Sequence, residues 1–388
     1  MPNVNPDLLK LKNNYFFNEI DKKVKLKNLK NPLNLGIGDI TQPLASSIIE
    51  ALKKASLEMG SKKTLKGYGP SDGYLFLKEK IKENDYLNLD IDIDEIFISN
   101  GIKYSASNIG DLFSKKSLVG IANPSYPVYV DANVIGGRKQ NILYLPLKEE
   151  NNFEPICPQS ALDIIYLCSP NNPTGIAQSR QSLEMWVDYA KKHQSVIIFD
   201  GAYGSFITSD NIPRSIYEIE GAKDVAIEMR SFSKQAGFTS LRCSYLVIPK
   251  KLKSKDNFLI NSLWKKYIDV RLGGVSYPIQ KAAEAIFSKT GKVEIQKTID
   301  IYQQNTKILL NGLKKLDYKV YGGIDSPYVW CKNPNNLTSW QFFDKLLDKS
   351  IISIPGSGFG TLGEGYIRFS GFAKKEIILE ALNNLKAL

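Results

Sequence analysis

Four short polar stretches carry the residues best suited to chemistry, and each of them follows an apolar run. They are Asn-Pro-Ser-Tyr at 123–126, Ser-Pro-Asn-Asn-Pro-Thr-Gly at 169–175, Asp-Gly-Ala-Tyr at 200–203 and Ser-Phe-Ser-Lys at 231–234. Together they supply an amine, a carboxylate, an amide, several hydroxyls and an aromatic ring. A pyridoxal phosphate site needs these groups: a Schiff-base lysine, an acid for the ring nitrogen, a donor to the ring hydroxyl, a stacking partner and an anion cradle.

Lys234 is the candidate for the Schiff-base lysine. Taken alone it would be read as one more of the 44 lysines on the surface. However, Ser231 and Ser233 precede it and are placed to donate to a phosphate, and Arg242 follows eight residues later. Arginine is scarce here, at seven of 51 basic residues, and its planar fork suits phosphate. We therefore predict that these four residues hold the cofactor.

Asp200 ends an apolar run, where a carboxylate is costly to bury without a partner. A protonated pyridine nitrogen is such a partner, and the ion pair would keep the ring an electron sink. Tyr203 and Asn172 could donate to the phenolic oxygen of the ring and so lower the pKa of the Schiff base. We predict catalytic roles for Lys234, Asp200 and Tyr203, and a cofactor contact for Asn172.

Three further positions complete the predicted site. Tyr126, between two prolines, is the expected stacking partner, although a core tyrosine would show the same pattern. Gly101, Ile102 and Lys103 follow an apolar run and open a predicted helix, whose first amides would bind phosphate. Arg368 is the candidate clamp for a substrate carboxylate, because a bidentate guanidinium–carboxylate pair fixes orientation.

Alternating apolar runs and amphipathic stretches predict the elements that position these residues. Strands are expected at 96–98, 118–122, 163–168, 196–199, 225–229 and 245–248, with a helix at 182–192. This alternation predicts an α/β domain with a mostly parallel central sheet, and the carboxyl ends of its strands would bring the polar stretches together. The later chain predicts a long helix at 280–316, strands near 318–320 and 328–330, and helices at 339–349 and from 374. We expect a large domain at 46–284 and a smaller α+β domain from 1–45 and 285–388.

Composition argues against several other classes of protein. The net charge of +11 comes mostly from scattered lysines, without the arginine-rich clusters typical of nucleic-acid surfaces. The four cysteines form no CxxC pair, and His193 is the only histidine, so zinc sites, disulfide frameworks and histidine-based catalysis are not indicated. No apolar run reaches the roughly 18 residues of a membrane helix, and the first residues lack the pattern of a secretion signal. We expect a cytoplasmic enzyme.

Several stretches resemble the fold-type-I pyridoxal-phosphate aminotransferases, and among them the LL-diaminopimelate aminotransferases. The resemblance runs nearly end to end and rests on Leu-Gly-Ile-Gly-Asp-Ile-Thr-Gln-Pro-Leu at 35–44, Gly-Tyr-Gly-Pro at 67–70, Asn-Pro-Ser-Tyr-Pro-Val-Tyr-Val-Asp at 123–131, Cys-Ser-Pro-Asn-Asn-Pro-Thr-Gly at 168–175, Pro-Arg-Ser-Ile-Tyr-Glu-Ile-Glu-Gly-Ala at 213–222, Ser-Phe-Ser-Lys-Gln-Ala-Gly-Phe-Thr at 231–239 and Pro-Gly-Ser-Gly-Phe-Gly at 355–360.

The resemblance implies an amino transfer between an amino acid and a 2-oxo acid. In this family the amino group passes from glutamate to tetrahydrodipicolinate, or in reverse. The resemblance also implies a homodimer with shared active sites, in which Tyr68 reaches the cofactor phosphate of the partner. Lys234 would move the proton between the substrate and the cofactor, and Gly38 would hold the substrate carboxylate together with Arg368 and Asn172. Tyr15 would contact the substrate as well.

The sequence departs from the family pattern where the far end of the substrate would bind. Ser71 stands where the family has an acidic residue, and the family's Phe-Asn-Gly-x-Ser stretch is Leu-Gly-Gly-Val-Ser at 272–276, so the asparagine beside Gly274 is lost. Losing a buried charge partner would cost about 2–5 kcal/mol of recognition. Two variants therefore stay open, the lysine-pathway enzyme and a paralogue with a changed substrate. A lyase, cyclase or oxidase on the same scaffold is the alternative reaction.

Overall fold

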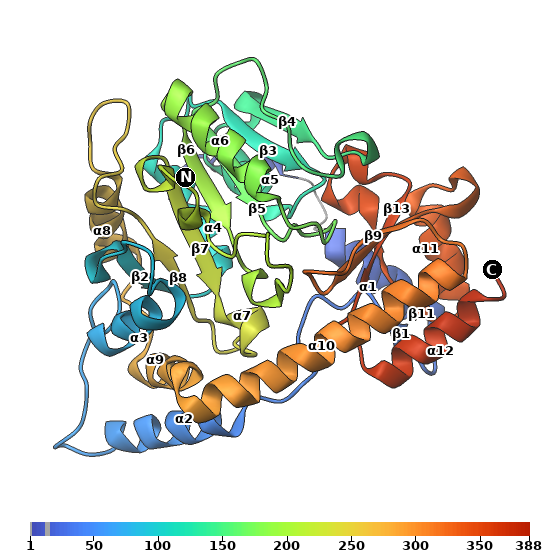
Figure 1. Ribbon diagram of the computed structural model, residues 1–388, viewed down its shortest axis with the longest axis horizontal. Helices are drawn as coiled ribbons and strands as arrows, with labels where there is room; N and C mark the ends of the chain where they lie inside the picture. The colour runs from blue at the N-terminus through green and yellow to red at the C-terminus, as the bar shows by residue number, and fades with distance from the viewer. Residues whose placement is uncertain (1, 12–15) are drawn as a thin grey trace.

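The computed structural model describes residues 2–11 and 16–388, and it confirms the predicted α/β architecture (Figure 1). A seven-stranded sheet forms the centre of the larger part of the molecule. In spatial order its strands are β2 (Ile96–Ser99), β8 (Ser244–Val247), β7 (Ala226–Ser231), β6 (Val196–Asp200), β5 (Ile164–Cys168), β3 (Val119–Asn123) and β4 (Ile142–Pro146).

The pairing of these strands confirms that the sheet is mostly parallel. The strands β4, β3, β5, β6 and β7 run parallel, and β8 runs antiparallel between β7 and β2. The strands β3, β5 and β6 are buried along their whole length, which explains their continuous apolar sequences. The polar stretches that follow β3, β5, β6 and β7 therefore lie at one edge of the sheet.

Helices cover this sheet, namely α2 (Ser46–Met59), α3 (Leu75–Asp85), α4 (Ile102–Asn108), α5 (Val128–Ile135), α6 (Arg180–His193), α7 (Phe232–Gln235), α8 (Ile260–Arg271) and α9 (Tyr277–Glu284). The residues that cap α6 explain where it begins and where it ends. Ser179 caps its first turn by accepting a hydrogen bond from the backbone of Ser182, and Gln194 ends it in the left-handed conformation. His193, the last residue of α6, lies against the ring of Tyr189.

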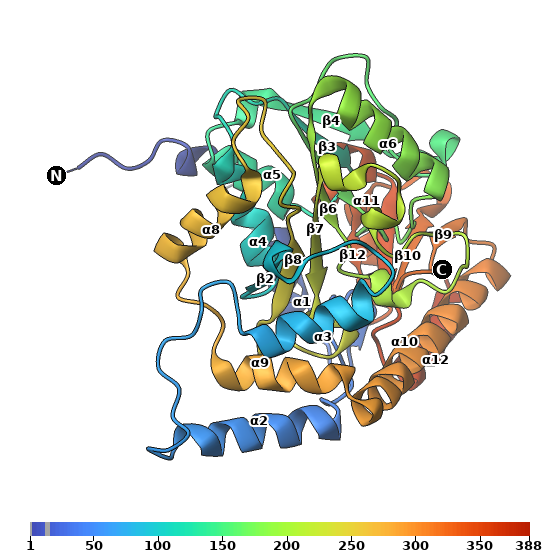
Figure 2. The same ribbon diagram turned by 60° about the vertical axis from the view of Figure 1, so that its left-hand side comes forward.

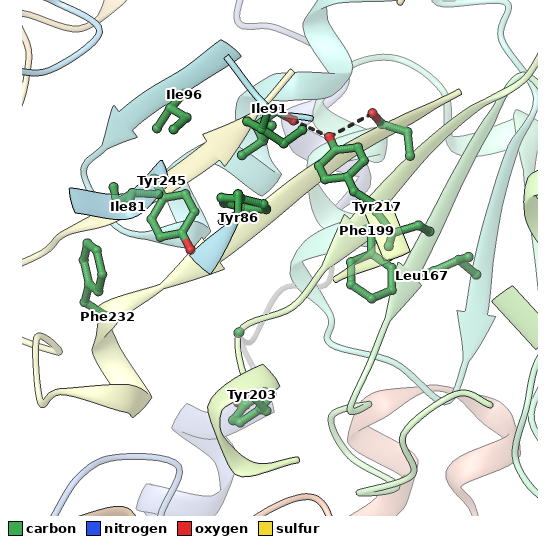
Figure 3. Packing of buried hydrophobic residues seen from close by; sticks show 14 of the residues in the cluster. Ile81, Tyr86, Ile91, Ile96, Leu167, Phe199, Tyr203, Tyr217, Phe232 and Tyr245 are labelled. Atoms are coloured by element: carbon green, nitrogen blue, oxygen red, sulfur yellow. Dashed lines mark hydrogen bonds between the residues drawn. The ribbon is translucent and has the colours of Figure 1, made fainter. Parts of the chain in front are cut away.

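Aromatic and branched side chains fill the space beneath the sheet (Figure 3). Phe199 packs there from β6, and Tyr203 lies in the segment that follows this strand. The hydroxyl of Tyr217 lies 3.1 and 2.9 Å from the backbone carbonyl oxygens of Ala226 and Val247, which share its one proton, so its burial does not leave it unsatisfied. This packing holds the loop after β6 against a rigid layer.

A second, smaller α+β unit lies beside the first. Its antiparallel sheet has the order β12 (Ile354–Pro355), β13 (Tyr366–Ser370), β10 (Tyr328–Lys332) and β9 (Val320–Gly322). The strand β1 (Leu33–Asn34) pairs in parallel with β11 (Ile351–Ile352), so the beginning of the chain joins this unit. Its helices are α1 (Phe16–Lys27), α11 (Ser339–Asp348) and α12 (Lys375–Leu385).

The single helix expected at 280–316 is wrong, because the chain breaks it in two. Helix α9 ends at Glu284, a 3₁₀ turn follows at Ala285–Phe287, and α10 runs over Lys289–Lys315. Ser288 has extended backbone and caps α10 by accepting a 2.9 Å hydrogen bond from the amide of Gly291. Figure 2 shows the change of direction, with α9 lying along α2 and α10 continuing toward α12.

Helix α10 connects the two units, since it starts against α2 and ends against α12 (Figure 1). Two buried clusters fill the larger unit and a third fills the smaller one. The domain limits at residues 45 and 284 remain a prediction. Within residues 2–11 and 16–388, no helix is long and apolar enough to cross a membrane.

Candidate active site

A cavity of about 670 Å³ opens at the carboxyl ends of β3, β5, β6 and β7, where the larger sheet meets the smaller unit. Its wall brings together most of the residues expected from the sequence. These are Gly38, Ile102, Lys103, Tyr126, Asn172, Asp200, Tyr203, Ser231, Ser233, Lys234, Arg242 and Arg368.

Asp200 ends β6 with only 4% of its surface exposed. One carboxylate oxygen accepts a 2.6 Å hydrogen bond from the hydroxyl of Tyr129, and the other accepts from the amide of Ala202 at 3.0 Å. Burial raises the pKa of this carboxyl, and no lysine or arginine of the described residues offsets the effect. A buried acid with only neutral donors is suited to a cationic ring nitrogen.

Lys234 lies in the short helix α7, which Ser231 caps by accepting a 3.1 Å hydrogen bond from the amide of Ser233. Its Nζ donates to the backbone carbonyl of Gly38. Burial lowers the pKa of Lys234 to about 8, the charge of Asp39 opposes this, and Arg368 and Arg242 lower it further. A lysine that loses its proton near neutral pH can react with a carbonyl group.

The opposite end of the cavity is built for an anion. Ser231 and Ser233 line it together with Arg242, whose guanidinium donates to the carbonyl of Thr239 and forms no ion pair in the described chain. Gly101 makes room for this guanidinium, because a Cβ there would lie 2.1 Å from its Nη2. Gly101 also has a φ of +86°, which favours glycine at the start of α4.

Tyr126 also lines the cavity, and its ring meets that of Tyr129 edge to face at 5.7 Å between centroids. The hydroxyl of Tyr203 lies 3.0 Å from that of Tyr328. Burial raises the pKa of Tyr203 well above its usual value, so this phenol keeps its proton. A ring face, a protonated phenol, a buried acid and an anion cradle together fit pyridoxal phosphate.

Arg368 is 2% exposed and lines the same cavity as Lys234. It donates to the side-chain oxygen of Asn172 at 2.7 Å and to the carbonyl of Gly36 at 3.0 Å. Its Nε is buried with no hydrogen-bond partner, and no acidic side chain of residues 2–11 and 16–388 pairs with it. A buried cation of this kind is suited to a carboxylate from outside the chain.

Three expected site residues of the described ranges do not line this cavity. Tyr68 is fully exposed on the segment between α2 and α3. Ser71 and Gly274 lie next to each other, since a Cβ on Gly274 would meet the backbone of Pro70 and Ser71. Tyr15 falls outside the described residues.

The cavity also contains residues that the sequence did not single out, among them Asn34, Asp39, Tyr129 and Tyr328. Tyr129 follows Tyr126 by three residues, so the helical period of α5 could have indicated it. Asp39 lies within the quoted stretch 35–44. Tyr328 had no signal in the sequence, because its strand belongs to the other sheet.

Comparisons with known proteins agree with this geometry. Residues 30–382 match the family model "Aminotransferase class I and II". The LL-diaminopimelate aminotransferase of Methanosphaera stadtmanae is 46% identical over 97% of both chains. Among solved structures, the L,L-diaminopimelate aminotransferase of Chlamydomonas reinhardtii has a TM-score of 0.94 at 36% identity, covering 100% of this chain and 98% of that one. Substrate-bound BacF of Bacillus subtilis has a TM-score of 0.87 at 28% identity, with the same coverage.

The cavity, its donor set and these matches agree on one family and one cofactor. The chain belongs to the class I and II aminotransferases, enzymes that depend on pyridoxal phosphate.

Proposed function

We propose that the protein transfers an amino group between glutamate and tetrahydrodipicolinate, forming LL-diaminopimelate, or runs the reverse reaction. The observation that carries the proposal is that Arg368, a buried cation without an acidic partner, shares one cavity with Lys234. The 46% identity to the LL-diaminopimelate aminotransferase of Methanosphaera stadtmanae supports these substrates over the changed substrate of a paralogue. The reaction would serve lysine biosynthesis, and we expect it to take place in the cytoplasm.

The roles of the cofactor-facing residues follow from their chemistry. Pyridoxal phosphate supplies an electron sink for the carbanion that forms at the substrate Cα. Lys234 would hold the cofactor and move the proton to and from that carbon. Asp200 would keep the ring nitrogen protonated, and Tyr203 and Asn172 would donate to the ring oxygen. Tyr126 would stack on the ring.

The phosphate would lie at the anion end of the cavity. Ser231, Ser233 and Arg242 would donate to it from one side, and the amides of Ile102 and Lys103 from the other. Hydrogen bonds to a charged group contribute about 1.5–3 kcal/mol each. The cradle would therefore retain the cofactor while Lys234 is engaged with the substrate.

The substrate carboxylate would bind Arg368, with Gly38 and Asn172 beside it. The short approach of Gly38 supports this placement, because a Cβ at this position would lie 3.4 Å from Nη2 of Arg368. Even a methyl group there would already be in van der Waals contact with the guanidinium. Arg368 would thereby fix the bond to Cα relative to the cofactor ring.

We propose further that the protein is a homodimer with shared active sites. The full exposure of Tyr68 supports this, since a large aromatic side chain on the surface of one subunit is available to a partner. Tyr68 would donate to the cofactor phosphate of the partner subunit. The same segment carries Ser71, so it would bring Ser71 and Gly274 to the far end of the partner's substrate.

Charged side chains surround Ser71. Its hydroxyl donates to the carboxylate of Asp269, and Lys265 donates to both, at 2.9 Å to Ser71 and 2.5 Å to Asp269. A distal ammonium and carboxylate of the substrate would find an acid and a base in this cluster. Asp269 would thus stand in for the acidic residue that position 71 lacks.

A panel of amino donors tests the proposed reaction. The purified enzyme is mixed with 2-oxoglutarate and with LL-diaminopimelate, L-lysine, ornithine or aromatic amino acids, and glutamate formation is measured. We expect turnover with LL-diaminopimelate. Turnover of another donor alone would contradict the proposed substrate, and release of free ammonia instead of glutamate would contradict transamination.

A further inference from the structure

Tyr328 lies between Arg368, which would bind the substrate carboxylate, and Tyr203, which would donate to the cofactor. It belongs to β10 of the smaller sheet, is 1% exposed and lines the cavity. Its hydroxyl is 3.0 Å from that of Tyr203, which comes from the larger unit. The guanidinium carbon of Arg368 lies 4.3 Å from the centroid of its ring. One side chain thus touches both functional groups.

We propose that Tyr328 is a positioning residue that acts on Tyr203 through its hydroxyl and on Arg368 through its ring. This inference rests on the roles proposed above for Tyr203 and Arg368. The hydroxyl and the ring of Tyr328 thus have separate roles, and different substitutions test each of them.

The hydroxyl of Tyr328 decides the direction in which Tyr203 donates. A phenol has one proton, so Tyr203 can donate either to Tyr328 or to the ring oxygen of the cofactor. When Tyr203 donates to the cofactor, its own oxygen can only accept, and Tyr328 is then the donor of the 3.0 Å hydrogen bond. Accepting this bond makes the proton of Tyr203 a stronger donor, because hydrogen bonds in a chain polarise one another.

The ring of Tyr328 sets the plane of the Arg368 guanidinium. The edge of the guanidinium is held by Asn172 and by the carbonyl of Gly36, and the aromatic ring lies under its face. A second ring, that of Phe359, lies 5.1 Å from the guanidinium carbon. Cation–π contacts of this kind are strongest when they are removed from water. The unpartnered Nε then stays available to a carboxylate.

Neighbouring strands hold this arrangement in register. In the antiparallel pair of β10 and β13, Trp330 lies opposite Arg368, so Tyr328 and Arg368 are diagonal neighbours on paired strands. Gly38 approaches both, because a Cβ on it would lie 3.6 Å from the hydroxyl of Tyr328. The carbonyl of Gly38 in turn accepts from Lys234. Tyr328 is therefore within two contacts of Lys234 and of the residues that would bind the substrate carboxylate.

Two substitutions separate the proposed parts. Tyr328→Phe removes the hydroxyl and keeps the ring, and Tyr328→Leu removes both. The first readout is the pH titration of the bound cofactor's absorbance, since donors to the ring oxygen lower the pKa of the chromophore. The second is the dissociation constant of glutarate, an unreactive dicarboxylate, together with the KM for 2-oxoglutarate.

We expect Tyr328→Phe to move the absorbance titration to higher pH by about half a unit or more, and to change glutarate binding less than about twofold. Tyr328→Leu should move the titration similarly and weaken glutarate binding by about 5- to 30-fold. Tyr217→Phe is the matched control, because it removes a buried tyrosine hydroxyl whose hydrogen bonds are drawn in Figure 3, and Tyr217 does not line the cavity. It should alter neither readout.

Tyr203→Phe keeps this test independent of the proposed function. If Tyr203→Phe moves the titration and Tyr328→Phe leaves it unchanged, the positioning role of Tyr328 is overturned while that of Tyr203 stands. If Tyr203→Phe itself has no effect, the role proposed for Tyr203 is wrong. Glutarate affinity that falls equally in Tyr328→Phe and Tyr328→Leu would overturn the part assigned to the ring.

Discussion

The guanidinium of Arg368 donates a 2.7 Å hydrogen bond to the side-chain oxygen of Asn172, although 196 residues separate them in the chain. Arg368 comes from the smaller sheet, and Asn172 follows β5 of the larger one. The residue proposed to bind the substrate is therefore tied directly to a residue proposed to bind the cofactor. Any displacement of one unit against the other would change both binding events.

Replacing Arg368 should affect the substrate more than the cofactor. Arg368→Lys keeps a positive charge but loses the bidentate fork. We expect KM for 2-oxoglutarate and for the amino donor to rise by about 30- to 1,000-fold, with the absorbance of the bound cofactor retained. Arg180→Lys, at an exposed ion pair with Glu218, is the control and should leave KM unchanged. An unaltered KM in Arg368→Lys would contradict the clamp.

Lys234→Ala tests the attachment of the cofactor. The variant should fold, lose amino transfer by at least about 10³-fold and lose the yellow absorbance of covalently held pyridoxal phosphate after gel filtration. Lys223→Ala, which removes a lysine paired with Asp90 on the surface, is the comparison. A Lys234→Ala protein that stays yellow after gel filtration would show that another lysine holds the cofactor.

The pKa of Lys234 makes cofactor uptake depend on pH. Burial lowers this pKa from 10.5 to about 8, and only the neutral amine attacks a carbonyl group. The neutral fraction therefore rises with pH up to about 8 and then levels off, instead of climbing past pH 10. Stopped-flow absorbance after mixing apoprotein with pyridoxal phosphate measures this profile. A rate that still increases tenfold per pH unit above pH 9 would contradict it.

Mixed dimers test whether Tyr68 acts on the partner subunit. Neither Lys234→Ala nor Tyr68→Ala homodimers should have an intact site, but a heterodimer of the two has one. After unfolding and random reassociation, about a quarter of the wild-type activity should return. Mixing Lys234→Ala with Arg368→Lys is the control: both residues line the same cavity of one chain, so neither site of that heterodimer is intact and activity should not return. Failure of the first mixture to regain activity would contradict a site shared through Tyr68.

Glu149 makes the junction between the two units sensitive to acid. Burial raises its pKa, but hydrogen bonds from Lys319, Lys332 and Tyr366 outweigh this and hold the value at about 2. In the folded protein the pKa of Glu149 is lowered from 4.5 to about 2. Its ionised carboxylate therefore stabilises the folded state fully above about pH 4.5, and this stabilisation is lost as the pH falls toward 2.

Glu149→Gln should therefore lower the free energy of unfolding at pH 7 by about 1 kcal/mol, after allowance for solvent screening, and the difference should shrink below pH 4.5. Denaturant unfolding at pH 7, 4 and 3 measures it. Glu150→Gln, at the neighbouring exposed position, is the control. A difference between wild type and Glu149→Gln that does not depend on pH would contradict the assigned pKa.

The sequence was sufficient for the cofactor end of the site because that end is built from local segments. Ser231 ends β7 and is followed by Ser233 and Lys234, and Asp200 ends β6, so all of them lie at the carboxyl end of a strand in the same sheet. Parallel strands bring their carboxyl ends to one edge, and the apolar runs identify those ends. The same pattern could not locate the break at Ser288, since an apolar helical period continues on both sides of it.

What the sequence determined by itself was therefore the sheet, its polar edge and the residues that would hold pyridoxal phosphate. The tertiary structure alone decided which partners surround them. Tyr129 as donor to Asp200, Tyr328 between Tyr203 and Arg368, and Asp269 beside Ser71 all depend on contacts between distant elements. Such contacts follow from how the two units pack, and neither strand alternation nor helical period encodes the distance between side chains on separate elements.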